Sequence, residues 1–435
     1  MNVSLNPAVW ALTRPAEIGL ALLLSAGVCL GAACSDTRGV VLGRVSDDSG
    51  GVGDAAADGA ADVAGDGAAD VMGRDAPDGS GDAAPDAAEV ASYCQGEGPP
   101  LLEGGGCWAA PVFERALCAC GDVTIAQALR TRMVDEDAPA PEGRASVASP
   151  ARFDVGEEWM VGGALVLSEP GGVAPGGPVR VEGAMRLGGP LTAERGVEVL
   201  EEAEVAGDVQ VGGDLTVVGA LTQPEGASLT VGGAEQLGER RVAPVVVEPP
   251  CGCGAAAVDP AAEVARASAD HDNALIGLDP DALDGVAQDT VLRLPCGRYL
   301  LSRVAGGERL IRLEIAGRVA LYVEGDLELE RDLAITLVGE RAELDLFVAG
   351  RLISSGTLQL GDRTRPDALR IHVAGGPLEL SGVLGLAGHL YAPTSDLTLT
   401  GDAEVFGSMH VRRLDMSGSL TVFFDPVAQE LTCAP

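Results

Sequence analysis

The chain contains no lysine, and all 29 of its basic residues are arginines, against 65 aspartates and glutamates. Without a lysine amine, Schiff-base catalysis and lysine isopeptide bonds are excluded. The formal net charge of −36 excludes a general nucleic-acid binder, because the phosphate backbone would be repelled. Aromatic residues make up only 3% of the chain and there are four histidines. Any clustering of ring side chains is therefore informative.

Long hydrophobic runs are also missing, apart from one near the N-terminus. Residues 18–30 read IGLALLLSAGVCL, after the single positive charge of Arg14 and before the small residues GAACS. This run is too short for a comfortable membrane span and is typical of a secretory signal peptide. No later stretch is long and apolar enough to cross a membrane.

The same N-terminal pattern resembles a bacterial lipoprotein signal, with Cys34 as the lipid-modified residue. Gly31 stands where that pattern usually has a branched aliphatic residue. The resemblance implies a signal peptide over 1–33 and several acyl chains on Cys34, which hold a protein at a membrane durably. We therefore expect an exported protein anchored in the cell envelope or on the cell surface. Cleavage by another peptidase would release it instead.

Residues 34–92 consist mainly of Asp, Ala and Gly, with an aspartate at every fourth position from Asp54 to Asp70. On a helix these carboxylates would repel one another, and the glycines weaken a helix further. With almost no large apolar side chains, the segment predicts a disordered stalk. A calcium-binding aspartate ladder is the alternative, but the glycine-aspartate nonapeptide of calcium-loaded β-rolls is absent.

Cysteines indicate an oxidising compartment. Beyond Cys29 and Cys34, eight remain, an even number that predicts disulfides in an exported chain. Eight cysteines permit 105 pairings, and the sequence does not choose among them. The two Cys-x-Cys pairs could also be metal ligands, but their spacing favours structural bridges, so we predict no metal and no cofactor. The disulfide candidates are Cys94, Cys107, Cys118, Cys120, Cys251, Cys253, Cys296 and Cys433.

A repeat defines the rest of the chain. Gly325, Gly350 and Gly375 are equally spaced, and shorter steps lead from Gly382 to Gly401 and on to Gly418. Between them lie short strands in which apolar and polar residues alternate. Steps of roughly 20 residues suit one coil of a parallel β-helix, in which each turn buries its apolar side chains against the next.

The sequence therefore predicts an all-β fold, a right-handed parallel β-helix that follows the stalk. A cysteine-containing segment and Pro-rich joint, expected to be a small stapled unit or a cap, precede it. The expected parts are 93–150 for that segment, 151–250 for a first solenoid part, 251–292 for a Cys-x-Cys and helical insertion, 293–426 for the β-helix core and 427–435 for a tail.

Strand periodicity assigns the two sides of one strand in each turn. Pairs such as Leu321 and Val323 should point inward, so the residue between them points outward. Three interpretations of this outer column remain open. It is a second core covered by 259–274 or by the cysteine-containing segment, an exposed strip that binds sugar rings or a protein, or a two-histidine metal site. The column consists of Tyr322, Phe347, His372, Tyr391 and His410.

Two resemblances concern the β-helix. VAGDVQVGGDLTVVG within 205–222 is similar to the repeats of bactofilins, polymer-forming cytoskeletal β-helices. LPCGRYLL at 294–301, Tyr391–Pro393 and Phe424–Asp425 resemble an uncharacterised β-helical domain at the ends of secreted bacterial proteins, including pilus-associated ones of the PilX kind. The second resemblance implies surface or adhesion association and supplies no catalytic residues.

Carboxylates on the outer side of another strand are candidate catalytic groups, because β-helices host polysaccharide lyases and hydrolases that gather carboxylates across neighbouring turns. Glu328, Glu379 and Asp415 share this strip, but Thr398 interrupts it. We therefore predict a non-enzymatic role in adhesion, matrix contact or structure. The expected partners are a membrane, through the lipid, and a polysaccharide or surface protein. The alternatives are a polysaccharide-active enzyme and a self-assembling structural element.

Overall fold

A computed structural model describes residues 40–41, 92–96, 98–100, 113–134, 145–253 and 259–429. In these residues the chain forms a parallel β-solenoid of about 13 turns, which confirms the predicted fold class. The predicted signal peptide, the predicted lipidation site Cys34 and the cysteines Cys107 and Cys433 lie outside the described residues, as does the predicted stalk apart from the short strand β1 (Val40–Val41). No helix in the described ranges is long and apolar enough to cross a membrane.

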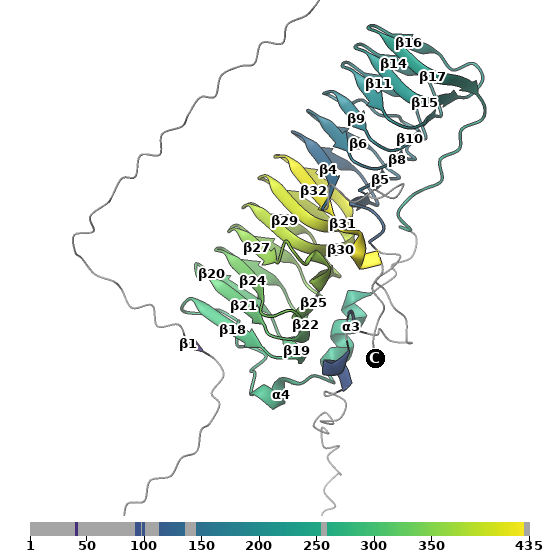
Figure 1. The fold of residues 1–435 in the computed structure, drawn as a ribbon. Helices are drawn as coiled ribbons and strands as arrows, with labels where there is room; N and C mark the ends of the chain where they lie inside the picture. Colours follow the sequence, from purple (N-terminus) through teal and green to yellow (C-terminus); the bar gives the residue numbers. More distant parts are fainter. Residues whose placement is uncertain are drawn as a thin grey trace, which may run out of the picture. The chain divides into compact units, whose positions relative to one another are not determined.

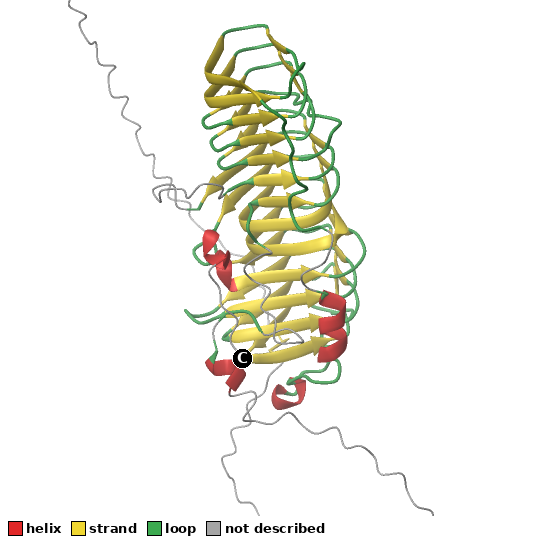
Figure 2. Cartoon of the chain, turned by 90° about the vertical axis from the view of Figure 1, so that its right-hand side faces the viewer, coloured by secondary structure: helices red, strands yellow, loops and turns green. Residues whose placement is uncertain are grey.

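The turns contribute strands to three faces, with only an isolated bridge at Val173 on the third face between β8 and β9, and Figure 2 shows the helices lying outside the stacked strands. The first face, in stacking order, consists of β18 (Thr290–Leu294), β21 (Ile311–Ile315), β24 (Leu333–Leu337), β27 (Leu358–Gly361), the start of β30 (Leu384–Leu399), the start of β31 (Ala403–Met416), β32 (Leu420–Phe424), β4 (Leu129–Met133), β7 (Trp159–Val161), β9 (Val179–Val181), β12 (Val197–Val199), the start of β15 (Leu215–Gln223) and the start of β17 (Glu235–Val242).

The second and third faces repeat this order. The second consists of β19 (Gly297–Leu301), β22 (Arg318–Val323), β25 (Glu343–Val348), β28 (Leu369–Val373), the middle of β30 and of β31, β2 (Leu117–Ala119), β5 (Val147–Ser149), β8 (Leu165–Leu167), β10 (Met185–Leu187), β13 (Ala203–Val205) and the ends of β15 and β17. The third consists of β20 (Val304–Gly307), β23 (Leu327–Leu329), β26 (Leu352–Ser354), β29 (Leu378–Leu380), the ends of β30 and β31, β3 (Val123–Ile125), β6 (Phe153–Val155), β11 (Leu191–Ala193), β14 (Val209–Val211) and β16 (Leu229–Val231).

Short strands form because apolar residues alternate with polar ones, so a typical three-residue strand such as β6 buries its first and third side chains and turns the second outward. The inward pairs expected from the sequence, among them Leu321 with Val323 and Leu346 with Val348, are buried and stack in register. Glycines allow the corners to touch. A Cβ added to Gly350 would lie 2.5 Å from the backbone of Gly325 on the turn below, so only glycine permits this approach.

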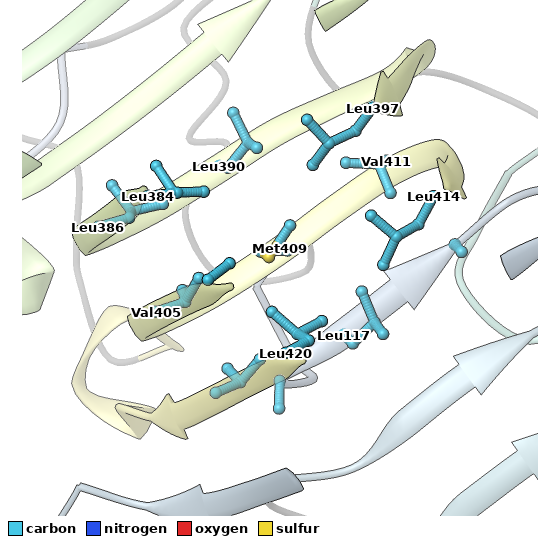
Figure 3. Close-up of a cluster of buried hydrophobic side chains, with 14 of the residues drawn as sticks. Leu117, Leu384, Leu386, Leu390, Leu397, Val405, Met409, Val411, Leu414 and Leu420 are labelled. Atoms are coloured by element: carbon cyan, nitrogen blue, oxygen red, sulfur yellow. The ribbon is translucent and has the colours of Figure 1, made fainter. Parts of the chain in front are cut away.

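The stacking order differs from the chain order. The last turn of the C-terminal segment does not end the solenoid, because β31 pairs in parallel with β2 and β32 pairs with β4. In Figure 1 the yellow strands of the C-terminus are therefore followed by the blue strand β4. Figure 3 shows the consequence in the core, where Leu117 lies beside Met409 and Leu420. We call residues 290–424 the lower half and residues 113–242 the upper half.

The sequence did not predict this order, and it also placed one boundary wrongly. Residues 117–133, assigned to a stapled unit or cap ahead of the solenoid, form β2, β3 and β4 at its centre. The chain then winds to β17 and returns outside the strands to the start of the lower half. The returning segment contains the helices α3 (Pro260–Ala267) and α4 (Asn273–Ile276), which lie within the predicted helical insertion, residues 251–292. Short 3-10 helices lie at η1 (Pro366–Ala368) and η2 (Pro426–Gln429).

The two ends of the solenoid are built differently. At the lower end, Leu278 and Leu283 are buried, and the backbone carbonyls of Pro280 and Leu283 accept bonds of 2.9 and 2.8 Å from the amides of Ser302 and Ala305. At the upper end, β16 and β17 have no further turn over them in the described residues. The inward side chains of β16 are consequently only partly buried.

Candidate functional site

The ring column predicted from the sequence exists. Tyr322 and Phe347 stack with ring centres 5.1 Å apart, and Phe347 and His372 with centres 4.6 Å apart. Tyr391 follows 6.0 Å from His372, and His410 lies 5.3 Å from Tyr391. One outward position on consecutive turns of the second face thus carries five rings. Cys118 of β2 takes the next place in the column, because it pairs with His410.

The column is not a free binding surface, because its five side chains have at most 7% of their surface exposed. Val264 and Ala267 of α3 pack on it together with Tyr93 and Phe113; Figure 1 shows α3 beside β22. The exposed-strip interpretation is therefore corrected. The structure instead has the covered second core, and both proposed covers contribute to it. The two-histidine metal interpretation also fails, since the ring of Tyr391 lies between His372 and His410.

A file of polar side chains runs beside the rings under the same cover. Arg370 donates bonds of 2.7 and 2.9 Å to the two carboxylate oxygens of Asp345, and both residues are fully buried. Burial opposes the charge on Arg370, but Asp345 and Glu343 raise the pKa of its guanidinium well above the ordinary value. On the next turn, burial and then Arg370 lower the pKa of His389 to about 3. This imidazole therefore stays neutral and bonds Ser408 at 2.8 Å.

Arg318 fastens the N-terminal part of the cover. Its guanidinium donates to the carbonyls of Tyr93, Gly98 and Pro99 at 2.8 to 3.0 Å, and it also lies 4.3 Å from the centre of the Tyr93 ring. A guanidinium can satisfy three carbonyls at once because its donors form a fixed planar fork. The cover is therefore an integral layer of the structure.

Three disulfides join cysteines of the described residues. Cys94–Cys296 ties the cover to the lower half, and Cys118–Cys251 and Cys120–Cys253 tie the returning chain to β2. The partners are separated by 202, 133 and 133 residues in sequence. The predicted use of these six cysteines as structural bridges is confirmed, and the pairing adds what the sequence left open.

One of these bridges lies close to a histidine. Cys120 Sγ is 3.4 Å from His410 Nε2, and the ligand atoms of Cys120, Cys253 and His410 all lie within 4.8 Å of one another. A metal would require free thiolates, whereas Cys120 and Cys253 are bonded to each other. In the oxidised protein this cluster is a disulfide with a neighbouring buried imidazole, and its Cys253 end is exposed.

The carboxylates considered as catalytic groups do not gather. Glu328 and Glu379 are separated by a turn that carries Ile353 between them. Glu379 and Asp415 are likewise separated by Thr398. Each pair is therefore two turns apart, about 9.6 Å at the spacing of neighbouring strands.

A hollow lies on the first face, where sequence reasoning had placed no site. It is an open groove of about 640 Å³ that spans β27, β30, β31, β32 and β4, and so crosses the junction of the two halves. Five outward positions form its floor. They are Gln359, Gly385, Glu404, Thr421 and Arg130.

Two rows of turns form the walls of the groove. One wall carries Val383, Asp402 and Ser419, which precede the strands. The other carries Arg363, which pairs with Glu404 and lies 4.6 Å from the centre of the Phe406 ring. Arg365 fixes this second wall by donating bonds of 3.0 Å to the carbonyls of Gly339 and Ala342. The signal that could have revealed the groove is Gly385, a missing side chain at a regular outward position.

Residues 255–431 match the family model of a domain of unknown function (DUF7305). The match takes in α3 and every strand of the lower half, whereas the upper half lies outside it. No curated protein and no solved structure matches the chain. The expected resemblance to an uncharacterised C-terminal β-helical domain is thus supported, and the resemblances to lipoprotein signals, pilus-associated proteins and bactofilins stay predictions.

Proposed function

We propose that this chain is an exported protein, anchored in the cell envelope through a lipid on Cys34, whose solenoid has a non-enzymatic role in adhesion or matrix contact. The observation that carries the proposal is the set of three disulfides, each between segments that are distant in the sequence. Bridges of this kind persist in oxidising compartments and are rare in the cytosol. They hold the cover and the returning chain against a fold that presents long outer faces.

The non-enzymatic part of the proposal is supported by the outer carboxylates. Hydrolases and lyases need carboxylates that face a shared cleft on the two sides of one bond. Glu328, Glu379 and Asp415 alternate with Ile353 and Thr398 along one strip. None of these three carboxylates lines the groove on the first face.

Fractionation tests export and anchoring. Cells that produce the full chain should retain it in the membrane fraction after a high-salt wash and release it with detergent. The Cys34→Ser variant should move to the soluble fraction. An alkylating reagent added before lysis should leave Cys94 and Cys296 unmodified. Recovery of the wild-type chain in the cytosol with free thiols would overturn the proposal.

A second candidate function, self-assembly, is favoured by the open upper end. Leu229, Val231 and Leu237 are only partly buried there, although equivalent residues on the turn below are buried. Unpaired strand edges are templates for another chain. However, the same turn carries Glu235 and Arg240 at inward positions, and inward charges oppose edge pairing. Light scattering across a hundredfold concentration range decides between a monomer and an assembling protein.

A further inference from the structure

The groove on the first face combines features that suit one class of ligand. It crosses five consecutive turns, so its floor is about 19 Å long at the spacing of neighbouring strands. It is open to solvent along this length and offers hydrogen-bonding groups on successive turns. An occupant therefore has to be extended and to present polar groups at a regular spacing close to that of the turns.

The charges on the floor of the groove are compensated, whereas one wall keeps the negative charge of Asp402, which accepts a bond from the backbone amide of Ser419. Glu404 pairs with Arg363, and Arg130 donates bonds of 3.0 and 2.9 Å to Glu158. The remaining floor and wall groups include the neutral side chains of Gln359, Thr421 and Ser419. Because the whole chain also carries a net charge of −36, an acidic polymer would be repelled. The polar surface left for a ligand is suited to neutral hydroxyl groups.

Apolar surface lies on both sides of these polar groups. Val383 on one wall has 58% of its surface exposed and offers apolar contact area to a ligand. Beyond Glu404 on the same strand, Phe406 is half-buried and stacks on Phe423 with ring centres 4.6 Å apart. A sugar ring has an apolar C–H face between its hydroxyl groups and can therefore contact both kinds of surface.

We propose that the groove binds a neutral polysaccharide lying along the solenoid axis, with successive sugars over successive turns. Gly385 is the key position, because its missing side chain leaves the floor low between Gln359 and Glu404. The hydroxyl groups of the polymer meet Gln359, Thr421 and Ser419, and its C–H surface meets Val383. The inference deepens the proposed function, on which it rests, since an envelope protein meets such polymers outside the cell.

A substitution can fill the groove without disturbing the fold. A Cβ added to Gly385 would lie 3.6 Å from the Leu358 carbonyl, an ordinary contact, and the backbone there has no positive φ. Gly385→Leu should therefore fold and block the floor. Thr398→Leu is the matched control, because it adds the same side chain to an exposed outward position of the same strand on the third face. Gln359→Ala removes a hydrogen-bonding group from an exposed position as a second, independent probe.

Affinity gel electrophoresis of the detergent-extracted full chain provides the measurement. The gels contain laminarin, dextran, mannan or hydroxyethyl cellulose as neutral polymers, and alginate or polygalacturonate as acidic ones. At least one neutral polymer should retard the wild-type chain and Thr398→Leu equally. Gly385→Leu should weaken that retardation at least tenfold, and Gln359→Ala severalfold, while the acidic polymers leave mobility unchanged.

Three results would overturn the inference: no retardation by any of the four neutral polymers, retardation by the acidic polymers alone, or equal retardation of wild type and Gly385→Leu. Thermal unfolding of each variant verifies that the solenoid is intact. Failure here is distinguishable from failure of the proposed function, because fractionation reports on export whether or not a polymer binds. An exported, anchored chain that binds none of the polymers keeps the proposed function and loses this inference.

Discussion

The lower and upper halves share one interior but differ on the outside. Below the open upper end, inward residues of both halves are apolar and buried, and they stack into one continuous core. On the second face, outward positions of the lower half carry rings and a buried ion pair beneath a cover. The equivalent positions of the upper half carry Arg186 and Glu204, 3.3 Å apart and largely in solvent. The inward residues thus specify the solenoid, and the outward residues determine what each part of it contacts.

The spacing of the turns differs in the same way. In the lower half the register pairs Leu344 with Leu369, whereas in the upper half it pairs Val147 with Leu165, which is a shorter step along the chain. The longer steps supply turns such as 361–368, which forms a wall of the groove. The longer turns of the lower half thus add a wall to the groove, while the upper half carries smaller hollows of about 320 and 300 Å³.

The largest difference between the halves is expected in the unfolding free energy that is lost when one arginine is replaced in each half. Arg370→Met leaves Asp345 buried without its partner and should cost about 3–5 kcal/mol of unfolding free energy. Arg186→Met in the upper half should cost less than about 1 kcal/mol, because its ion pairs are exposed. Urea unfolding measures both. Equal losses would show that the cover does not isolate the lower half from solvent.

Removal of the Cys94–Cys296 disulfide, which ties down the cover, should have the next largest effect on the free energy of unfolding. Replacing Cys94 and Cys296 together with serine should lower the free energy of unfolding by about 2–4 kcal/mol, because the unfolded chain loses a constraint. Hydrogen exchange should become faster at residues 92–96 and 98–100, where the bonds to Arg318 and Glu343 and the packing of Tyr93 would then hold the segment. Exchange in β8 and β10 of the upper half serves as the internal control and should stay unchanged. Faster exchange there would mean that the two halves unfold together.

Acid should weaken the lower half through its buried histidines. Burial first, and Arg370 second, hold the pKa of His372 well below its ordinary value of 6.5. Between the lowered pKa of His372 in the folded chain and 6.5, the unfolded chain binds a proton that the folded chain does not. The contribution of His372 to stability is therefore full above pH 6.5 and falls as the pH drops. Each pH unit in this window costs about 1.4 kcal/mol per histidine.

His372→Phe should remove that contribution while keeping a ring between Phe347 and Tyr391. The difference in unfolding free energy between the wild-type chain and the variant, measured from pH 7 to pH 4, isolates the effect from the many surface carboxylates. The wild-type chain should lose more stability over this range. Parallel pH profiles would indicate that His372 is protonated in the folded protein.

The interior of each turn was predictable from sequence because its determinants are local. Alternation of apolar residues set the inward pairs, and the glycine steps set the register that brings Tyr322 and Phe347 together. The cover was one of the interpretations left open. What failed was the order of the turns. Leu117 pairs with Met409 from the opposite end of the chain, and one short Val-x-Val-like strand fits on any other, so no local signal records which turns meet.

The polar file was missed for a different reason. Asp345 and Arg370 occupy the same outward position on consecutive turns, so the repeat already placed them side by side. Charged outward residues are usually solvated, and only the cover turns this pair into a buried one.

The role of the aspartates in the turns was also missed. Asp326, Asp332 and Asp402 each accept a 2.8 Å bond from a backbone amide on the next turn, which explains why carboxylates recur at the corners.

The smallest effect expected is the response of the two ion pairs to salt. At 1 M ionic strength charges in solvent are screened within about 3 Å, so the cost of Arg186→Met should vanish there. Asp345 and Arg370 are fully buried, and added ions cannot come between them. The cost of Arg370→Met should therefore be the same at low ionic strength and at about 1 M NaCl. A cost that falls with salt would mean that solvent and ions reach Asp345. The cover would then not shield the second face of the lower half.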